Sequence, residues 1–210
     1  METIKRMNHC LMASIAIFLF SFASYGQDYE KIQAAFADSY SKEFSGETNK
    51  AIEILKTVYD ENSYEINVRL GWLSYNSGNF TESTAYYQKA INLKPFAIEP
   101  RFGLVMPAAA VGNWETVKQQ YEKILEIDPM NTRANYYLGM IYYNREKYDD
   151  ALPCFEKVAN LYPFDYDGNL MYAWTNLKLG KLREAKVLFN KVLMMRPGDK
   201  SAEEGLKSIK

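Results

Sequence analysis

Apolar residues recur along most of the chain at the three- and four-residue spacing that is typical of amphipathic helices. Val187, Leu188, Val192 and Met195 show this pattern in one segment. Glycine and proline interrupt such segments at regular distances, which predicts short helices joined by turns. The expected helix pairs cover about 64–77 with 80–93, 98–111 with 114–127, 132–145 with 148–161, and 166–179 with 182–195.

The turns between these segments reveal an internal repeat. Pro95, Pro129, Pro163 and Pro197 are separated by 34 residues each time. A period of this length indicates one helical hairpin that is repeated along the chain. Alignment on the prolines gives a turn column of Gly78, Gly112, Glu146 and Gly180, and an aromatic column of Tyr87, Tyr121, Phe155 and Phe189.

This pattern resembles the tetratricopeptide repeat, with Leu138-Gly139, Ala151, Phe155 and Pro163 among the matching residues. The resemblance implies an all-α fold, a right-handed α-solenoid of antiparallel helix pairs, with about four clear repeats and one degenerate repeat. The expected domain covers 27–210, with the degenerate repeat at 28–61, clear repeats at 64–97, 98–131, 132–165 and 166–199, and a C-terminal capping helix at 200–210.

Local features of the repeats lead to further expectations. Gly71 and Gly139 are placed where two helices cross, so that a small residue lets them approach closely. Pro107 falls in the middle of a predicted helix, and we expect a kink or a break near Val105–Pro107. Ser201-Ala-Glu-Glu204 matches a capping box, with Ser201 as the N-cap of the terminal helix.

The first 26 residues follow a different pattern. Lys5 and Arg6 precede an apolar run from Leu11 to Phe22, and small residues follow up to Gly26. This order is typical of a secretory signal peptide, and we expect cleavage after Gly26 and export to the periplasm or cell envelope of a bacterium. The alternative is an uncleaved N-terminal anchor, although the run is shorter than the roughly 20 apolar residues of a membrane span.

Composition argues against catalysis and against nucleic acid as a partner. The formal net charge is -1, without a basic stripe of lysine and arginine. Loss of residues 1–26 would remove His9 and Cys10, which leaves no histidine and Cys154 as the sole cysteine. A histidine-assisted nucleophile and a zinc site are then excluded, and we expect no enzyme activity, cofactor or metal. Cys154 itself is expected to be buried and inert.

The resemblance further implies a concave groove, lined by the first helix of each pair, that binds another protein. This groove is unusually rich in aromatic residues and methionine, and it lacks the lysine and asparagine pair that captures carboxylate tails. We therefore expect an apolar peptide or an amphipathic helix as the partner. Two alternatives remain, namely packing of the same side chains within the array and homo-oligomer contact. The predicted groove residues are Val68, Arg69, Trp72, Tyr75, Asn76, Phe102, Met106, Arg133, Tyr136, Tyr137, Met140, Tyr143, Asn144, Leu170, Met171 and Trp174.

Overall fold

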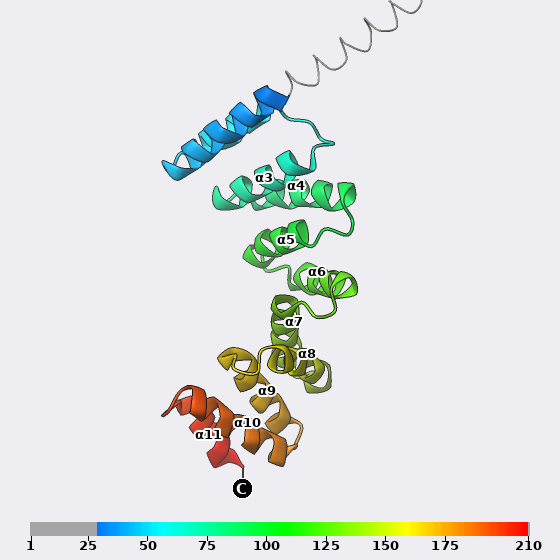
Figure 1. The fold of residues 1–210 in the computed structure, drawn as a ribbon. Coiled ribbons are helices and arrows are strands. Elements are labelled where there is room, and N and C mark those ends of the chain that lie inside the picture. Colours follow the sequence, from blue (N-terminus) through cyan, green and yellow to red (C-terminus); the bar gives the residue numbers. More distant parts are fainter. Residues whose placement is uncertain (1–28, 210) are drawn as a thin grey trace, which may run out of the picture. The chain divides into compact units, whose positions relative to one another are not determined.

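The computed structural model describes residues 29–209, and within this range all regular secondary structure is helical (Figure 1). The predicted signal peptide, with its cleavage site and the alternative anchor, lies outside the described residues. A helix over 29–44 is followed by α2 (Thr48–Lys56), α3 (Tyr64–Asn76), α4 (Phe80–Leu93), α5 (Glu99–Ala110), α6 (Trp114–Ile127), α7 (Thr132–Asn144), α8 (Tyr148–Leu161), α9 (Tyr166–Lys178), α10 (Leu182–Met195) and α11 (Lys200–Ser208).

The chain divides after Lys94 into two compact units. Among the described residues, the first unit contains the helix over 29–44 and α2 to α4, and the second contains α5 to α11. Each unit has its own core of buried apolar side chains. The all-helical arrangement in antiparallel pairs agrees with the predicted α-solenoid, and the observed helix bounds follow the predicted pairs closely.

Turn and cap residues explain where the helices begin and end. Gly78, Gly112 and Gly180 adopt φ values of +81°, +73° and +71° between the two helices of their pairs. This left-handed conformation is one that glycine adopts without a steric penalty, as the turn column predicts. The Asn131 side chain begins α7 by accepting a hydrogen bond from the backbone N–H of Ala134 at 3.0 Å.

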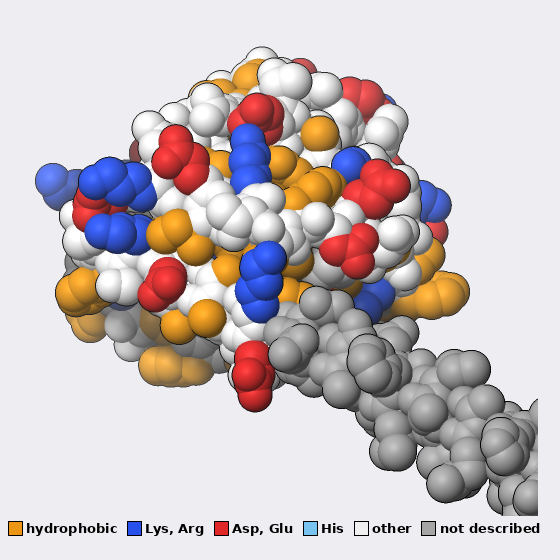
Figure 2. All heavy atoms as spheres, turned by 90° about the horizontal axis from the view of Figure 1, so that it is seen from above, with side chains coloured by type: hydrophobic (Ala, Val, Ile, Leu, Met, Phe, Trp, Pro, Cys, Tyr) orange, Lys and Arg blue, Asp and Glu red, His pale blue; other side chains and the backbone are white. Residues whose placement is uncertain are grey.

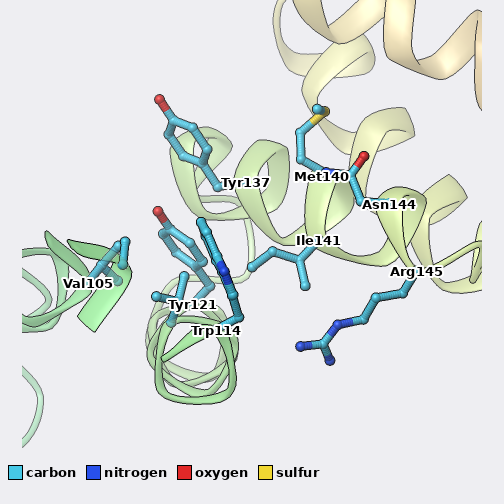
Figure 3. Close-up of a pocket in the computed structure, with 10 residues that line it drawn as sticks. Val105, Trp114, Tyr121, Tyr137, Met140, Ile141, Asn144 and Arg145 are labelled. Atoms are coloured by element: carbon cyan, nitrogen blue, oxygen red, sulfur yellow. The ribbon is translucent and has the colours of Figure 1, made fainter. Parts of the chain in front are cut away.

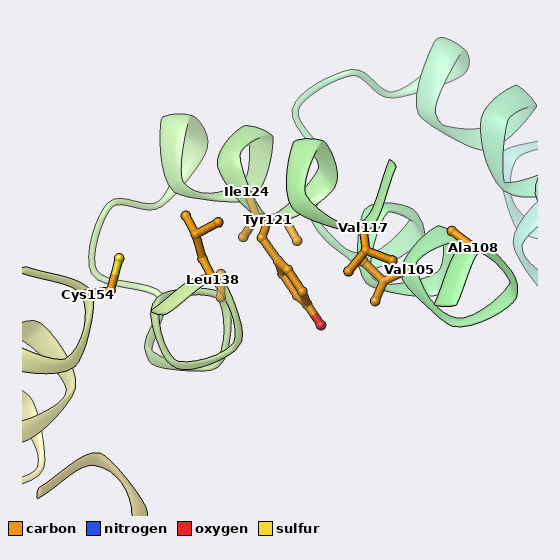
Figure 4. Close-up of a cluster of buried hydrophobic side chains, with 8 residues drawn as sticks. Val105, Ala108, Val117, Tyr121, Ile124, Leu138 and Cys154 are labelled. Carbon is orange, nitrogen blue, oxygen red and sulfur yellow. The ribbon is translucent and has the colours of Figure 1, made fainter. Parts of the chain in front are cut away.

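The core at the start of the second unit shows how adjacent pairs are held together (Figure 4). Val117, Tyr121 and Ile124 lie three and four residues apart, so they share one face of α6. Together with Leu138 of α7, they belong to one cluster of buried side chains. Burial of these apolar residues therefore joins the second helix of one repeat to the first helix of the next.

Gly71 and Gly139 occupy the close approach that the sequence predicts. A Cβ atom on Gly71 would lie 3.0 Å from the ring of Tyr87, and one on Gly139 would lie 2.9 Å from the ring of Phe155. Both distances are shorter than ordinary contacts between carbon atoms, which are about 3.5–4.0 Å. The aromatic column thus packs directly on the backbone of the small-residue column.

The structure contradicts part of the prediction for Pro107. The predicted break at Pro107 is wrong, because α5 continues from Glu99 to Ala110 with Pro107 in its last turn. A proline removes one backbone donor, and the turns after it remain paired, since the Val111 N–H donates to the Pro107 carbonyl oxygen at 3.2 Å. A kink, the other possibility, stays a prediction.

The N-cap of the terminal helix is Asp199, not Ser201. The Asp199 carboxylate accepts a hydrogen bond from the Ala202 N–H at 2.9 Å, and α11 begins one residue later than Asp199. Ser201 therefore lies inside the first turn, where its hydroxyl accepts a hydrogen bond from Trp174 Nε1 at 3.0 Å. The predicted capping helix is itself present, and its Ala202 and Leu206 pack on the core formed by α9 and α10.

Glu146 gives a test of the turn geometry, because it stands in the glycine column with a φ of +59°. We expect Glu146→Gly to raise the free energy of unfolding by up to about 1 kcal/mol. The left-handed conformation costs an L-residue roughly 1–2 kcal/mol, and the greater flexibility of glycine when unfolded offsets part of the gain. Urea unfolding measures the change. The reverse substitution in the same column, Gly180→Glu, should destabilise the protein by a similar amount.

Candidate binding site

An apolar pocket of about 540 Å³ lies between α5, α6 and α7 in the second unit (Figure 3). Figure 3 shows Val105 at one end and Arg145 at the other, with the Trp114 ring between Tyr121 and Ile141. The volume is within the range of about 300–1,000 Å³ that is typical of ligand pockets. The lining residues are Val105, Ala109, Trp114, Val117, Tyr121, Tyr137, Met140, Ile141, Asn144 and Arg145.

One position of the repeat, where the two helices of a pair cross, is unusual beside the pocket. Val105 stands in the register position that is occupied by Gly71, Gly139 and Ala173 in the other clear repeats. Correspondingly, α5 and α6 pack less extensively against each other than the helices of the other three pairs. A β-branched side chain at the crossing prevents the close approach that glycine allows, so that space is left between the helices.

The aromatic column contributes Tyr121 to the lining of the pocket. Tyr121 is buried and stacks on Tyr137 of α7, with ring centroids 5.8 Å apart and an interplanar angle of 13°. Its ring also meets the ring of Phe102 edge-on at 6.2 Å. Burial raises the pKa of Tyr121 to about 12, so its hydroxyl stays protonated at neutral pH. The floor of the pocket is therefore aromatic and uncharged.

The rim of the pocket is partly polar. Asn144 and Arg145 lie at the end of α7, and Arg145 Nη1 is 3.7 Å from Glu115 Oε2 of α6. Trp114 is 54% exposed and Tyr137 is 45% exposed, so both rings are accessible to a partner. Large aromatic side chains that are only partly covered are typical anchors of protein interfaces.

A second pocket of about 380 Å³ adjoins the first at Tyr137, which lines both. It lies between the N-terminal half of α7 and the turn that joins α8 to α9. Its lining residues are Thr132, Arg133, Tyr136, Tyr137, Val158, Tyr162, Asp165 and Asp167.

Several predicted groove residues meet at these two pockets, whereas others pack within the second unit. Tyr137, Met140 and Asn144 line the first pocket, and Arg133, Tyr136 and Tyr137 line the second. Phe102 is partly buried beneath the guanidinium of Arg133, at 4.5 Å. Met106, Leu170 and Met171 are also partly buried. Tyr143 packs on Tyr148 at 5.2 Å, and Trp174 packs on Phe189 at 5.1 Å.

Scans against family models identify the repeats by sequence. Residues 132–165 match one model described as "Tetratricopeptide repeat", and residues 64–96 and 166–199 match a second model with the same description. These three segments are tetratricopeptide repeats.

Known proteins with similar repeats support the same conclusion. The TPR repeat-containing protein YpiA of Bacillus subtilis (strain 168) is 28% identical over 155 residues, which are 71% of this chain and 36% of YpiA. The chain thus spans about a third of the length of that relative.

Solved structures with low sequence identity share the fold. The crystal structure of a tetratricopeptide repeat protein from Parabacteroides merdae ATCC 43184 aligns with a TM-score of 0.71 and 20% identity, over 86% of this chain and 72% of that one. The structure of YrrB, described as a TPR protein with an unusual peptide-binding site, aligns with a TM-score of 0.64 and 22% identity, over 76% and 79% of the two chains. At such identities the likeness shows the fold alone.

In the first unit, the predicted groove side chains of the repeat at 64–96 are engaged by the helix over 29–44. Arg69 is buried and forms an ion pair with Glu43, with Nη2 2.6 Å from Oε2. Trp72 Nε1 donates a hydrogen bond to Glu43 Oε1 at 2.6 Å, and Asn76 Nδ2 donates to the same oxygen at 3.4 Å. The Arg69 guanidinium also covers the Tyr40 ring at 3.9 Å.

This arrangement favours, for the first unit, the alternative in which the predicted groove residues pack within the protein. Val68 and Tyr75 are partly buried as well, and Tyr75 lies between the rings of Trp72 and Phe80. Burial raises the pKa of Glu43, but the contacts with Arg69 and Trp72 outweigh it and hold the pKa below its usual value. Glu43 is therefore ionised at neutral pH and links the two helices.

Sequence reasoning missed the part of the pocket that comes from α6, the second helix of its repeat. Trp114, Val117 and Tyr121 belong to α6, and the groove rule considers only the first helix of each repeat. The signal that could have found them is Val105, the one large residue in a small-residue column. Arg145, just beyond α7, was missed for a similar reason, since it follows the last groove position of its repeat.

Cys154 is buried as predicted, and burial raises the pKa of its thiol to about 11. Because the thiolate is the reactive form, we expect the folded protein to react with a thiol reagent at pH 8 at least a hundredfold more slowly than an unhindered thiol. Unfolding in urea should restore the ordinary rate. Absorbance assays of a thiol-disulfide reagent measure both rates, and rapid labelling of the folded protein would contradict the burial.

The described residues show no sign of a metal site or a membrane span. Within 29–209, no group of three or more histidine, cysteine, aspartate or glutamate side chains is placed to hold a metal ion. In the same range, each helix is too short or too polar to cross a membrane. On the face shown in Figure 2, acidic and basic side chains are interspersed with hydrophobic ones, and no large area of a single charge is visible among the described residues.

Proposed function

We propose that this protein is a non-catalytic scaffold or adaptor that binds an apolar side chain of a partner protein in the pocket between α5, α6 and α7. Tetratricopeptide repeats generally mediate protein–protein interactions, and the fold of this chain is typical of scaffolds without catalytic activity. The similarity to YrrB, a TPR protein with an unusual peptide-binding site, supports a peptide or a partner helix as the ligand. The binding mode proposed here is specific to the repeat at 98–131 and its neighbour.

The observation that carries the proposal is an open apolar pocket flanked by accessible aromatic rings. Apolar surface of this kind gains free energy on burial, at roughly 25 cal/mol per Å². Trp114 and Tyr137 offer large rigid contact areas, and the flexible Met140 can adapt to the shape of a bound side chain. An apolar or aromatic residue of a helix or an extended peptide would fill such a pocket as an anchor.

Site-specific photo-crosslinking in cells tests the proposal. A photoreactive amino acid at Met140 should capture one specific partner, which mass spectrometry of the crosslinked peptide then assigns to an apolar segment. Tyr137→Ala in the same protein should reduce this capture strongly. A photoreactive residue at Lys186, an exposed position on α10, is the matched control and should not capture that partner. Equal capture from both positions, or capture unaffected by Tyr137→Ala, would exclude the pocket as the binding site.

A second copy of the chain is the alternative occupant of the pocket. Light scattering at several protein concentrations distinguishes it from a different protein. We expect a monomer at tens of micromolar. A dimer that Tyr137→Ala dissociates would overturn the proposal in favour of self-assembly through the same face.

We further propose that the protein acts in the cell envelope after export and removal of residues 1–26. The charge and hydropathy pattern of these residues supports this location. Cell fractionation and N-terminal sequencing of the mature protein should find it outside the cytoplasm, beginning at Gln27. An intact N-terminus in the cytoplasmic fraction would exclude export, whereas an intact N-terminus in the membrane fraction would favour an anchor.

A further inference from the structure

The second pocket, beside the apolar one, differs from it in chemistry. Three tyrosine rings and two carboxylates line it, from α7, from the turn between α8 and α9, and from the first turn of α9. Tyr162 is the C-cap of α8, Asp165 is the N-cap of α9, and Asp167 lies in the first turn of α9. Tyr136 packs edge-on against both Tyr137, at 5.4 Å, and Phe155, at 6.0 Å, so its ring is held in place.

The two positive groups near this pocket each have a contact of their own. Arg133 is its only basic lining residue, and its guanidinium covers the Phe102 ring on the side of α5. The positive end of α9 is capped by Asp165, whose Oδ1 accepts a hydrogen bond from the Gly168 N–H at 2.7 Å. Asp167 adds a full negative charge in an exposed position beyond this cap.

The pKa shifts of two tyrosines indicate which charged residues lie near each pocket. Burial raises the pKa of Tyr136, and the negative charges of Asp167 and Asp165 raise it further. The positive charge of Arg133 acts on Tyr121 instead. It lowers the pKa of Tyr121, but burial raises that pKa by more. The second pocket therefore holds two carboxylates and one guanidinium, whereas the first is mainly apolar with Arg145 at its rim.

We propose that the second pocket binds a lysine or arginine side chain of the same partner segment whose apolar residue fills the first pocket. This inference rests on the proposed function, because the two pockets share Tyr137 as a lining residue. The partner is thus a peptide or helix with a large apolar residue close to a basic one. It is not an acidic tail, which Asp165 and Asp167 would repel.

Two interactions favour a cation in this position. The faces of tyrosine rings attract an ammonium or guanidinium group, with about 0.5–1 kcal/mol at exposed sites. Asp167 and the second oxygen of Asp165 add ion pairs that are each worth about 0.2–1 kcal/mol at a surface. Tyr162 is 58% exposed, so a long basic side chain can lay its apolar stem along this ring and place its charged end at the carboxylates.

A pair of small probes tests the cation preference directly. N-acetyl-lysine methylamide should shift the NMR signals of residues 132–137 and 162–167 at millimolar concentration. N-acetyl-norleucine methylamide has nearly the same shape without the charge and should shift these signals far less. Equal shifts with both probes, or shifts with neither, would overturn the inference.

Variants that remove the charges of the two aspartates but keep the fold give a second test. Asparagine is as good an N-cap as aspartate, so Asp165→Asn together with Asp167→Asn removes two charges and keeps the cap of α9. We expect this double variant to bind the lysine probe about tenfold more weakly, as the loss of two exposed ion pairs implies. Asp149→Asn in the first turn of α8 is the control and should leave binding unchanged. An unchanged affinity in the double variant would exclude the carboxylates.

Selection from a random peptide library separates this inference from the proposed function. The unaltered protein should enrich peptides that carry a large apolar residue with lysine or arginine nearby. The Asp165→Asn/Asp167→Asn variant should still enrich the apolar residue and lose the basic one. Enrichment of apolar residues alone by both proteins would overturn the cation site only. Failure to enrich any apolar residue would overturn the proposed function itself.

Discussion

Replacing Phe155 by alanine is expected to lower the free energy of unfolding by about 3–5 kcal/mol, the usual cost of truncating a fully buried phenylalanine. Phe155 has no exposed surface, and its ring packs against the backbone at Gly139 and against Tyr136. The substitution would leave a cavity where two helices cross, which these neighbours can only partly fill. Urea unfolding followed by far-ultraviolet circular dichroism measures the change.

The same substitution at an exposed phenylalanine provides the control. Phe164 is 78% exposed, and Phe164→Ala should change the unfolding free energy by no more than about 0.5 kcal/mol. Similar losses at the two positions would contradict the packing described for α7 and α8. The fit to Gly139 can be tested with Gly139→Ala, since its new Cβ would lie 2.9 Å from the Phe155 ring. Gly139→Ala should be less harmful when Phe155→Leu is also present, because the shorter side chain makes room for the methyl group.

Glu43→Gln is expected to destabilise the first unit by about 3 kcal/mol. Arg69 is buried, so loss of its partner leaves a buried charge without compensation, which typically costs about 3–5 kcal/mol. We expect the lower end of this range, since the Glu43 side chain is itself 24% exposed and water can partly replace the lost charge. Thermal and urea unfolding measure the effect, provided that Trp114 and Trp174 are replaced by phenylalanine so that the fluorescence of Trp72 reports on the first unit.

Two further variants show whether the buried charge is the cause. Glu47→Gln makes the same change at a surface ion pair of the same unit and should have little effect. Glu43→Leu combined with Arg69→Met removes both charges and should recover much of the stability that Glu43→Gln loses. If the double variant is no better than Glu43→Gln, the cost arises from lost packing and not from the unpaired charge.

The pH dependence of stability gives an independent measure of the same contact. The pKa of Glu43 in the folded protein lies below the ordinary value of 4.5, because its contacts with Arg69 and Trp72 outweigh burial. The unfolded chain therefore binds a proton at this group first as the pH falls. The stabilisation is fully present above about pH 4.5 and is lost as the pH decreases through the folded pKa. Glu43→Gln should show a weaker loss of stability in this acidic range than the unaltered protein.

Much of the fold follows from residues that recur every 34 positions. The prolines, the turn glycines and the aromatic column locate each helix pair closely, because each of these residue types satisfies a local backbone or packing need that the repeat imposes. The sequence did not identify the correct N-cap where two suitable residues lie close together. Asp199 and Ser201 are both good N-caps, and only the path of the chain into α11 decides that Asp199 begins the helix.

The candidate site was predictable only in part from the sequence. Tyr137 and Met140 follow from the groove positions, which are set by the helical period. Trp114 and Tyr121 do not, because they lie on the second helix of their repeat and border the pocket only through the way α6 packs between α5 and α7. Likewise, the pattern placed Arg69 and Trp72 on a groove, and the structure shows Glu43 holding both.

The sequence by itself thus determined the repeat, its helices and the rings that fill each hairpin, since these depend on contacts within one period of the chain. It also determined that Cys154 is buried, because this residue sits beside Phe155 in a core column. The tertiary structure alone decided which aromatic side chains remain accessible. Accessibility depends on the spacing between helices, and α5 and α6, which have Val105 where the other pairs have glycine or alanine, pack less extensively and border the apolar pocket.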